Sequence, residues 1–163
     1  MEIRKYQEPD WSRLWPAIEK VFRSGETYPL SPEITEQEAY KAWIELPQET
    51  YVATAGDGKL LGTYYIKPNQ PGLGSHVCNC GYIVSESARG KGVASVMCEH
   101  SQQVAVEAGF RAMQYNLVVS TNEVAVRLWK KLGFQVIGIL PKAFKSNSAG
   151  YVDALVMYKE LKI

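Results

Sequence analysis

The sequence is poor in the residues that build metal centres and disulfide frameworks. Its 163 residues include three cysteines and two histidines. Cys78, Cys80 and Cys98 are odd in number and the first two form C-x-C, so reduced thiols are expected rather than a disulfide framework. With only His76 and His100 to complete a ligand set, a zinc site would need an unfamiliar spacing. We therefore expect no metal.

Charge of one sign and long hydrophobic runs are also missing. Lys and Arg number 18 and Asp and Glu 17, for a formal net charge of +1, so no basic field draws nucleic acid or an anionic membrane. No stretch approaches the roughly 18 apolar residues that span a bilayer. The opening MEIRKYQEPDW lacks the basic-then-apolar layout of a signal peptide. We expect a cytoplasmic protein that binds neither nucleic acid nor membranes.

Repeats, low-complexity tracts and long linkers are absent, so no domain boundary is visible in the sequence. A hydrophobic content of 46% over 163 residues suffices for one sizeable core. We expect a single domain over residues 1–163. The oligomeric state stays open, with a homodimer among the options.

Hydrophobic periodicity and turn residues predict a mixed α/β fold. Strands are expected at residues 2–6, 51–55, 60–67, 77–84, 113–119, 134–140 and 151–158. Helices are expected at residues 11–22, 35–46, 93–108 and 123–132. The buried face of the third helix is expected to carry Val93, Val96, Met97, His100, Val104 and Ala108. A loop at Pro141–Tyr151 is expected to fold over a site.

A glycine-containing turn joins the expected strand at residues 77–84 to the helix behind it. The turn reads Arg89-Gly90-Lys91-Gly92-Val93-Ala94. Small residues before a helix N-terminus let a phosphate approach unpaired N–H groups, where the helix dipole favours negative charge. The motif lacks the Gly-Lys-Ser/Thr of a Walker loop and the second half-sheet of a nicotinamide fold. Taken alone, it suits a diphosphate site and an ordinary strand-to-helix turn equally well.

This turn and three further motifs resemble the GCN5-related N-acetyltransferase (GNAT) family. The family's pyrophosphate loop reads Arg/Gln-x-x-Gly-x-Gly/Ala and appears here as Arg89-x-x-Gly92-x-Ala94. The other motifs are Cys80-Gly81-Tyr82-Ile83-Val84, Asn122-x-x-Ala125-x-x-Leu128-Trp129-x-Lys131-x-Gly133-Phe134 and Tyr151-x-Asp153-x-x-x-Met157. Together they cover about half of the chain in the right order, which makes the resemblance specific.

The resemblance implies a mixed, mostly antiparallel sheet of six to seven strands, flanked by four helices. The sheet would be splayed between the strands at 77–84 and 113–119, with acetyl-coenzyme A in the gap. Backbone groups of Ile83 and Val84 would pair with its pantetheine arm, and the turn at residues 89–94 would bind its diphosphate. Asn122 would contact coenzyme A, although its position before a helix equally suits an N-cap. The implied activity is acetyl transfer to a small amine.

One position departs from the catalytic pattern of the family. In many relatives a tyrosine protonates the departing thiolate, and this sequence has Trp129 there. An indole N–H does not titrate, so either another group protonates the sulfur or the thiolate takes its proton from water. The backbone N–H of Val84 remains the expected donor to the developing oxyanion. His76 is expected to be structural or solvent-facing rather than a general base.

Two asparagines belong to a narrower resemblance. The segments Lys67-Pro68-Asn69-x-Pro71-Gly72-x-x-Ser75-His76-Val77-x-Asn79 and Asn116-Leu117-Val118-x-x-Thr121-Asn122 are similar to fungal family members that act on proline analogues such as azetidine-2-carboxylate. This implies that Asn79 engages the ring nitrogen of the substrate. The backbone at Asn116 and Leu117 would hold its carboxylate. The plainer alternative is that both asparagines only satisfy backbone groups at the splay.

The sequence therefore favours an N-acetyltransferase for a small amine, with an amino acid or a proline-like imino acid among the acceptors. Two alternatives stay open. One is a coenzyme A-binding sensor or structural module without turnover, to which Trp129 lends weight. The other is acetylation of a protein N-terminus or lysine, which needs an open groove. Three aromatic residues, Tyr28, Trp43 and Tyr64, are expected in the core rather than in a substrate pocket.

Overall fold

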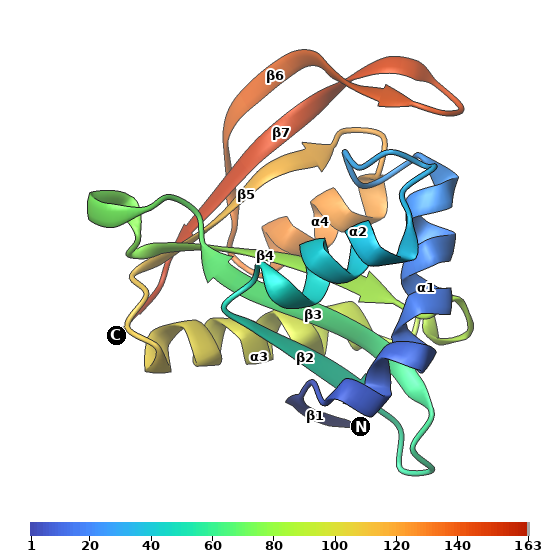
Figure 1. The fold of residues 1–163 in the computed structure, drawn as a ribbon. Coiled ribbons are helices and arrows are strands. Elements are labelled where there is room, and N and C mark those ends of the chain that lie inside the picture. The colour runs from blue at the N-terminus through green and yellow to red at the C-terminus, as the bar shows by residue number, and fades with distance from the viewer. Residues whose placement is uncertain (163) are drawn as a thin grey trace.

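Seven strands and four α-helices make up the computed structural model, which describes residues 1–162 (Figure 1). The strands are β1 (Glu2–Lys5), β2 (Glu49–Thr54), β3 (Leu60–Pro68), β4 (Val77–Val84), β5 (Ala112–Val119), β6 (Gln135–Ser146) and β7 (Gly150–Glu160). The helices are α1 (Trp11–Ser24), α2 (Glu36–Tyr40), α3 (Val93–Glu107) and α4 (Glu123–Lys131), and a π-helical turn (Lys41–Glu45) continues α2. In the described range, no helix is both long and apolar enough to cross a membrane.

One sheet contains all the strands, in the order β1-β2-β3-β4-β5-β7-β6. Neighbours run antiparallel except β4 and β5, which are parallel and pair only at Val77 with Ala112 and at Cys78 with Met113. Beyond these two pairs the strands separate, while each stays paired with its other neighbour. The expected fold, a mostly antiparallel sheet splayed at this point and flanked by four helices, is confirmed.

Helices cover both faces of the sheet and create two core clusters (Figure 1). On the face of α3 and α4, Met97, Met113 and Trp129 belong to the larger cluster. On the face of α1 and α2, Leu14 and Phe22 belong to the second. Because α1 and α4 lie on opposite faces, the splay receives side chains from both sides of the sheet.

The last two strands form a longer hairpin than the sequence predicted. The expected loop at Pro141–Tyr151 is wrong, because β6 continues to Ser146 and β7 begins at Gly150. Pro141 lies inside β6, which is the edge strand of the sheet, and an edge strand tolerates a residue without an N–H. The register is irregular around residues 140–144, beside this proline. The hairpin extends beyond the sheet and over the loop between α1 and α2 (Figure 1).

The buried face of α3 also differs from the expectation. Val96 and Ala108 are exposed, whereas Ser101 and Ala105 are buried. Ser101 is accommodated because its hydroxyl shares a hydrogen bond of 2.7 Å with the Tyr82 hydroxyl and also donates to a carbonyl of its own helix. The buried face of α3 was predicted from apolar residues alone. Such a prediction could not include Ser101, because its hydrogen-bond partner Tyr82 lies on β4.

Candidate functional site

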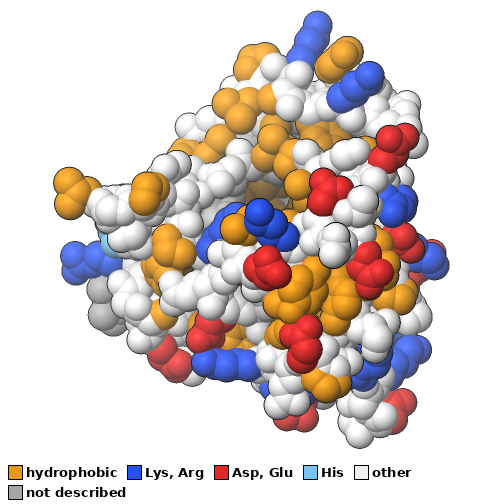
Figure 2. All heavy atoms as spheres, in the orientation of Figure 1, with side chains coloured by type: hydrophobic (Ala, Val, Ile, Leu, Met, Phe, Trp, Pro, Cys, Tyr) orange, Lys and Arg blue, Asp and Glu red, His pale blue; other side chains and the backbone are white. Residues whose placement is uncertain are grey.

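A cavity of about 1070 Å³ opens where β4 and β5 separate. Its walls come from β3, β4, β5, the turn before α3, α4 and the loop between α1 and α2. Figure 2 shows a hollow near the middle of one face, with hydrophobic side chains around it, basic side chains below it and an acidic side chain beside it. Within residues 1–162, the charged side chains that line the cavity are all basic, namely Lys67, Arg89, Arg127 and Lys131. The electrostatics of the cavity therefore favour an anionic ligand.

The pairing of β4 with β3 decides which backbone groups face the cavity. The Ser85 N–H and the Val77 C=O each bond to the β3 side at 2.8 Å, and antiparallel alternation then assigns the odd-numbered residues of β4 to that ladder. The N–H and C=O of Val84 therefore point into the gap, as its predicted role requires. Those of Ile83 point to β3, so only its side chain lines the cavity and the backbone contact predicted for it does not fit.

β5 is interrupted beside the cavity. Between Tyr115 and Val118 its register with β7 shifts, so Asn116 and Leu117 form a bulge. Both bulge residues line the cavity. The Asn116 side chain donates to Asn69 Oδ1 at 2.6 Å, which ties the bulge to the turn after β3. A bulge leaves backbone groups outside the ladder, where they are available to a ligand.

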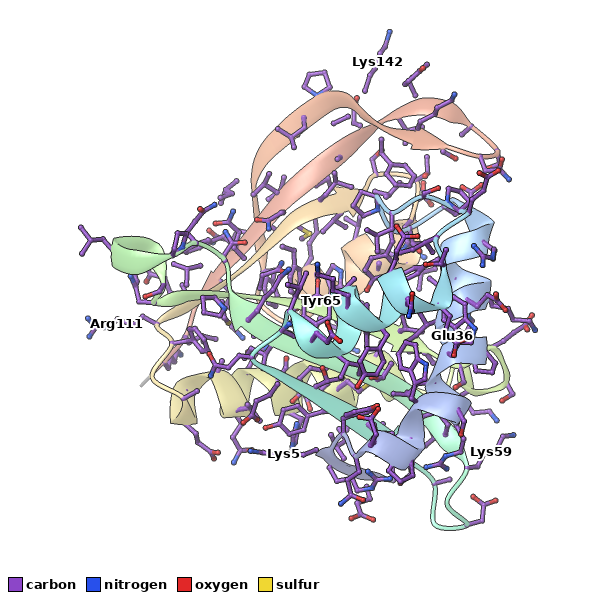
Figure 3. The ribbon with its side chains drawn as sticks, in the orientation of Figure 1. Lys5, Glu36, Lys59, Tyr65, Arg111 and Lys142 are labelled. Carbon is purple, nitrogen blue, oxygen red and sulfur yellow. The ribbon has the colours of Figure 1, made fainter. Side chains whose placement is uncertain are left out.

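Asn79 spans the point where β4 and β5 part. It is 7% exposed, and its amide NH2 donates to the Gln114 C=O of β5 at 2.9 Å. Its Oδ1 accepts from the Tyr65 hydroxyl at 3.3 Å, near the middle of the molecule in Figure 3. Burial raises the pKa of Tyr65 to about 12, so the phenol keeps its proton and the orientation of the amide is fixed. The side chain therefore satisfies a backbone carbonyl and still keeps one lone pair on Oδ1.

The turn before α3 keeps its backbone open to the cavity. Gly90 and Gly92 have φ angles of 75° and 78°, and a Cβ added to either would meet no atom within 4 Å. The cavity is lined by Arg89, Gly90, Gly92, Val93 and Ala94. Lys91, predicted with them, is exposed and lies outside the lining. No side chain caps α3, so the N–H groups of its first turn remain available to a ligand.

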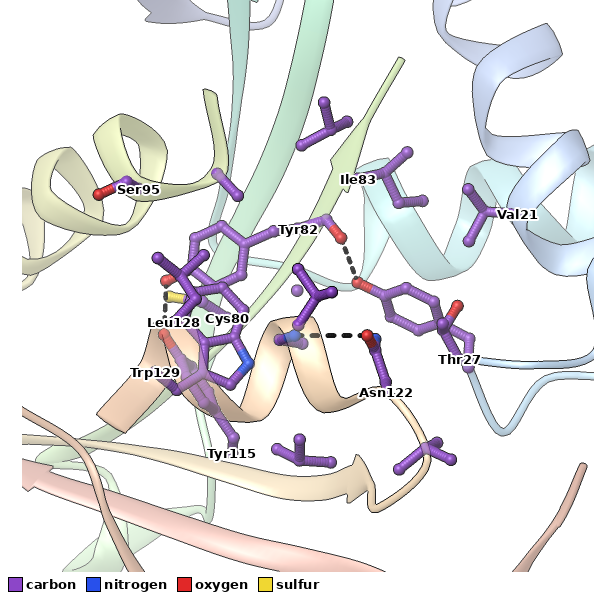
Figure 4. Close-up of a pocket in the computed structure, with 18 of the residues that line it drawn as sticks. Val21, Thr27, Cys80, Tyr82, Ile83, Ser95, Tyr115, Asn122, Leu128 and Trp129 are labelled. Carbon is purple, nitrogen blue, oxygen red and sulfur yellow. Dashed lines mark hydrogen bonds between the residues drawn. The ribbon is translucent and has the colours of Figure 1, made fainter. Parts of the chain in front are cut away.

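Asn122 and Trp129 are the two residues of the α4 segment that the sequence marked. The Asn122 Oδ1 accepts from the Ala125 N–H at 3.4 Å, a long capping bond that does not use its NH2 group. Trp129 is 9% exposed, and its ring centroid lies 5.1 Å from those of Tyr82 and of Tyr115 (Figure 4). The indole is therefore part of an aromatic cluster in the wall of the cavity.

Two tyrosine hydroxyls lie in a buried polar group beside this cluster. The Tyr115 hydroxyl donates to that of Tyr82 at 3.0 Å, and the latter shares a bond of 2.7 Å with Ser101. Burial raises the pKa of both phenols well above the usual value. Both hydroxyls are thus neutral and bonded to one another or to serine, and neither is directed as an acid toward the cavity.

The tip of the β6–β7 hairpin contacts the loop between α1 and α2, whose residues Thr27, Tyr28 and Pro29 line the cavity. The Asn147 N–H donates to the Gly25 C=O at 3.1 Å. The Glu26 carboxylate accepts from the Ser146 hydroxyl at 2.8 Å and from the Ser148 N–H at 2.9 Å. The hydrogen bonds from these two serines lower the pKa of Glu26, which keeps it ionised. These contacts hold the loop between α1 and α2 against the hairpin.

Some lining residues were not identified from the sequence. Tyr28 was expected in the core with Trp43 and Tyr64, and the latter two are buried there. Tyr28 packs on Phe22 and Trp43 at the edge of the second core cluster and also lines the cavity. Its hydroxyl donates to the Tyr82 C=O of β4, 54 residues away, at 2.8 Å, a contact without any local signal. The Thr27 hydroxyl is buried on the cavity wall without a hydrogen-bond partner in residues 1–162. His76 is exposed and outside the lining.

The chain is similar in sequence and in structure to known acetyltransferases. Residues 11–134 match the profile of the acetyltransferase (GNAT) family. The N-acetyltransferase aca1 of Schizosaccharomyces pombe is 34% identical over 168 residues, covering 93% of this chain and 80% of that protein. A GCN5-related N-acetyltransferase from Kribbella flavida superposes with a TM-score of 0.93 at 41% identity, over 98% of this chain and 97% of that one. At 17% identity, a phosphinothricin acetyltransferase from Sinorhizobium meliloti, solved in complex with AcCoA, shares the fold with a TM-score of 0.86, over 98% and 88% of the two chains.

Proposed function

This chain belongs to the acetyltransferase (GNAT) family, and we propose that it acetylates a small amine carrying a carboxylate, foremost a proline-like imino acid. Acetyl transfer from acetyl-coenzyme A to nitrogen is the activity that comes with the family. The acceptor has to be inferred from the site. The observation that carries the proposal is the cavity lining, in which every charged side chain is basic.

The residues at the splay fit coenzyme A, which supplies the activated acetyl group when bound. Its diphosphate would lie against Gly90, Gly92 and the first turn of α3, where the backbone is open and the helix dipole favours negative charge. Arg89 adds positive charge, and the NH2 group of Asn122 is left over from capping. The N–H and C=O of Val84 can pair with the amides of an extended arm, as an added strand would.

The acceptor must present a neutral nitrogen to the acetyl group. Basic surroundings disfavour an ammonium ion, and a carboxylate on the same molecule offsets the repulsion that a purely cationic amine would meet. The second lone pair of Asn79 Oδ1 can accept the N–H of the amine and orient its lone pair. Backbone groups at Asn116 and Leu117, freed from the ladder by the bulge, can bind the carboxylate.

Positioning then contributes more to the rate than acid–base chemistry does. The Val84 N–H can donate to the carbonyl oxygen as it becomes negative. Trp129 offers no titrating proton, and the hydroxyls of Tyr82 and Tyr115 are engaged with one another. We infer that water, rather than a side chain on this side of the cavity, takes the proton that the acceptor nitrogen loses and supplies a proton to the leaving sulfur.

The rival functions receive less support from the geometry. A protein N-terminus or a lysine side chain carries no carboxylate next to its nitrogen, so it would leave the bulge groups at Asn116 and Leu117 without that partner. The packing of Trp129 against Tyr82 and Tyr115 explains why a tryptophan stands where many relatives have a tyrosine. Its presence therefore no longer favours a binding module without turnover.

An acceptor panel tests the proposal. We expect release of free coenzyme A thiol with azetidine-2-carboxylate and with proline. Pyrrolidine and prolinamide should show kcat/KM values lower by about tenfold or more, because an ionic contact worth about 1.4 kcal/mol is lost. Activity confined to peptide N-termini or to lysine side chains would contradict the proposal.

The change Gly92→Asp should weaken coenzyme A binding by about tenfold or more, because it adds negative charge beside the diphosphate and strains a backbone with positive φ. Isothermal calorimetry measures the affinity. Gly58→Asp is the matched control, since Gly58 also has positive φ and open space but lies outside the cavity lining. Equal affinities for the two variants would remove this turn from the site.

Asn79→Ala should leave coenzyme A affinity nearly intact while kcat/KM falls about 30- to 1000-fold, because the hydrogen bond that would orient the acceptor nitrogen is lost. Asn79→Asp separates the two roles of the residue, since it keeps an oxygen for the acceptor and loses the donor to the Gln114 C=O. We expect the Asp variant to retain more turnover than the Ala variant at a comparable melting temperature. A defect in stability alone, with normal specific activity, would limit Asn79 to backbone satisfaction.

Trp129→Phe should retain turnover within about tenfold of the parent, because an aromatic ring still packs on Tyr82 and Tyr115 and no proton donor is lost. Steady-state kinetics with saturating acetyl-coenzyme A measure the effect. If turnover collapsed while the fold and the cofactor affinity stayed intact, the indole would have a direct part in the chemistry.

A further inference from the structure

Lys67 is a cation at the acceptor side of the cavity. It lies on β3 directly opposite Asn79 on β4, as an antiparallel partner on the same face. Its Nζ lies 5.3 Å from the centroid of the Tyr65 ring, and the Tyr65 hydroxyl in turn bonds to Asn79. The ring holds the ammonium beside the asparagine through a cation–π contact.

Lys67 has no carboxylate partner in the described chain. None of the ion pairs in residues 1–162 includes it, although its side chain is half-buried. The other basic residues of the lining belong to the turn before α3 and to α4, where the phosphates would bind. The ammonium gains no counter-ion from the described chain, so an anionic group of a ligand in the cavity would stabilise it.

The bulge of β5 faces the same end of the cavity. Asn69, two residues after Lys67, accepts from the side chain of Asn116 at 2.6 Å. Asn116 begins the bulge whose backbone groups lie outside the ladder. The ammonium, the asparagine on β4 and the bulge thus approach one region from three strands.

We propose that Lys67 is a specificity-determining residue that pairs with the carboxylate of the acceptor and selects amines whose acid group lies next to the nitrogen. The inference rests on the proposed acetyl transfer in this cavity and adds the side chain that reads the acid group. The bulge supplies directional N–H groups, while Lys67 supplies the charge. Its action is on acceptor binding, so it should change KM for the acceptor more than kcat.

The test compares an acid with its amide. Lys67→Met keeps the aliphatic stem against Tyr65 and removes the charge. We expect KM for proline or azetidine-2-carboxylate to rise about 10- to 100-fold, with kcat and KM for acetyl-coenzyme A little changed, because a charge-assisted contact is lost. KM for prolinamide should stay within about twofold, since the amide carries no charge for Lys67 to pair with. Lys67→Arg should keep most of the preference for the acid.

Lys59→Met is the matched control, because it removes one exposed positive charge near the start of the same strand, away from Tyr65 (Figure 3). It should leave the acid-to-amide ratio unchanged. An equal loss for the acid and the amide in Lys67→Met, or no loss for either, would overturn the role of Lys67.

Calorimetry distinguishes this inference from the proposed function. Proline titrated into the enzyme with coenzyme A should bind to the parent and at least about tenfold more weakly to Lys67→Met, whether or not it is acetylated. If imino acids were not acetylated but alanine and alaninamide showed the same Lys67-dependent ratio, the imino acid proposal would fail while Lys67 kept its role. The role of Lys67 would be rejected by an unchanged acid-to-amide ratio in Lys67→Met, combined with either of two binding results. The first is that proline does not bind to the parent, and the second is that it binds equally well to Lys67→Met.

Discussion

The separation of β4 from β5 after two residue pairs is the constraint on which the rest of the site depends. Strands that part inside a protein leave N–H and C=O groups that must find other partners. Asn79 binds one of them, the Gln114 carbonyl, and Tyr28 binds another, on β4. The groups of Val84 point into the same gap. Asn79 and Tyr28 thus give hydrogen-bond partners to backbone carbonyls inside the gap, whereas the N–H and C=O of Val84 remain available to a ligand.

The gap is kept open by packing from behind. Trp129 lies against Tyr82 of β4 and Tyr115 of β5, and Phe134 stacks on Tyr115 at 4.3 Å. These rings fill the space that a continuous ladder would otherwise close, so the strands cannot approach without expelling them. A tryptophan has more ring surface than the tyrosine common at this position in the family, and here it serves that packing. Trp129 therefore removes the titrating hydroxyl that the family commonly has at this position, and its ring packs between the separated strands.

Local patterns sufficed for the strand at 77–84, the glycine turn behind it and the splay implied by the family resemblance. They did not suffice where the strand register decides which residue faces the gap, or where a contact joins residues far apart in the sequence. Ile83 and Val84 look alike in sequence, and only the register with β3 shows which of them faces the gap. Tyr28 reaches a carbonyl 54 residues away. Pro141 lies in a strand where a loop was predicted, and a proline fits there only because β6 is an edge strand, which depends on the order of the whole sheet.

The contact between the hairpin tip and the loop between α1 and α2 depends little on which side chains form the tip. Two of its three bonds are donated by main-chain N–H groups, those of Asn147 and Ser148, and main-chain donors survive every substitution except proline. Side chains at the tip can therefore change while the loop that carries Thr27, Tyr28 and Pro29 of the cavity wall stays in place, provided that Glu26 and the turn at Gly25 remain. The tip can thus vary, naturally or by design, without disturbing the residues that line the cavity.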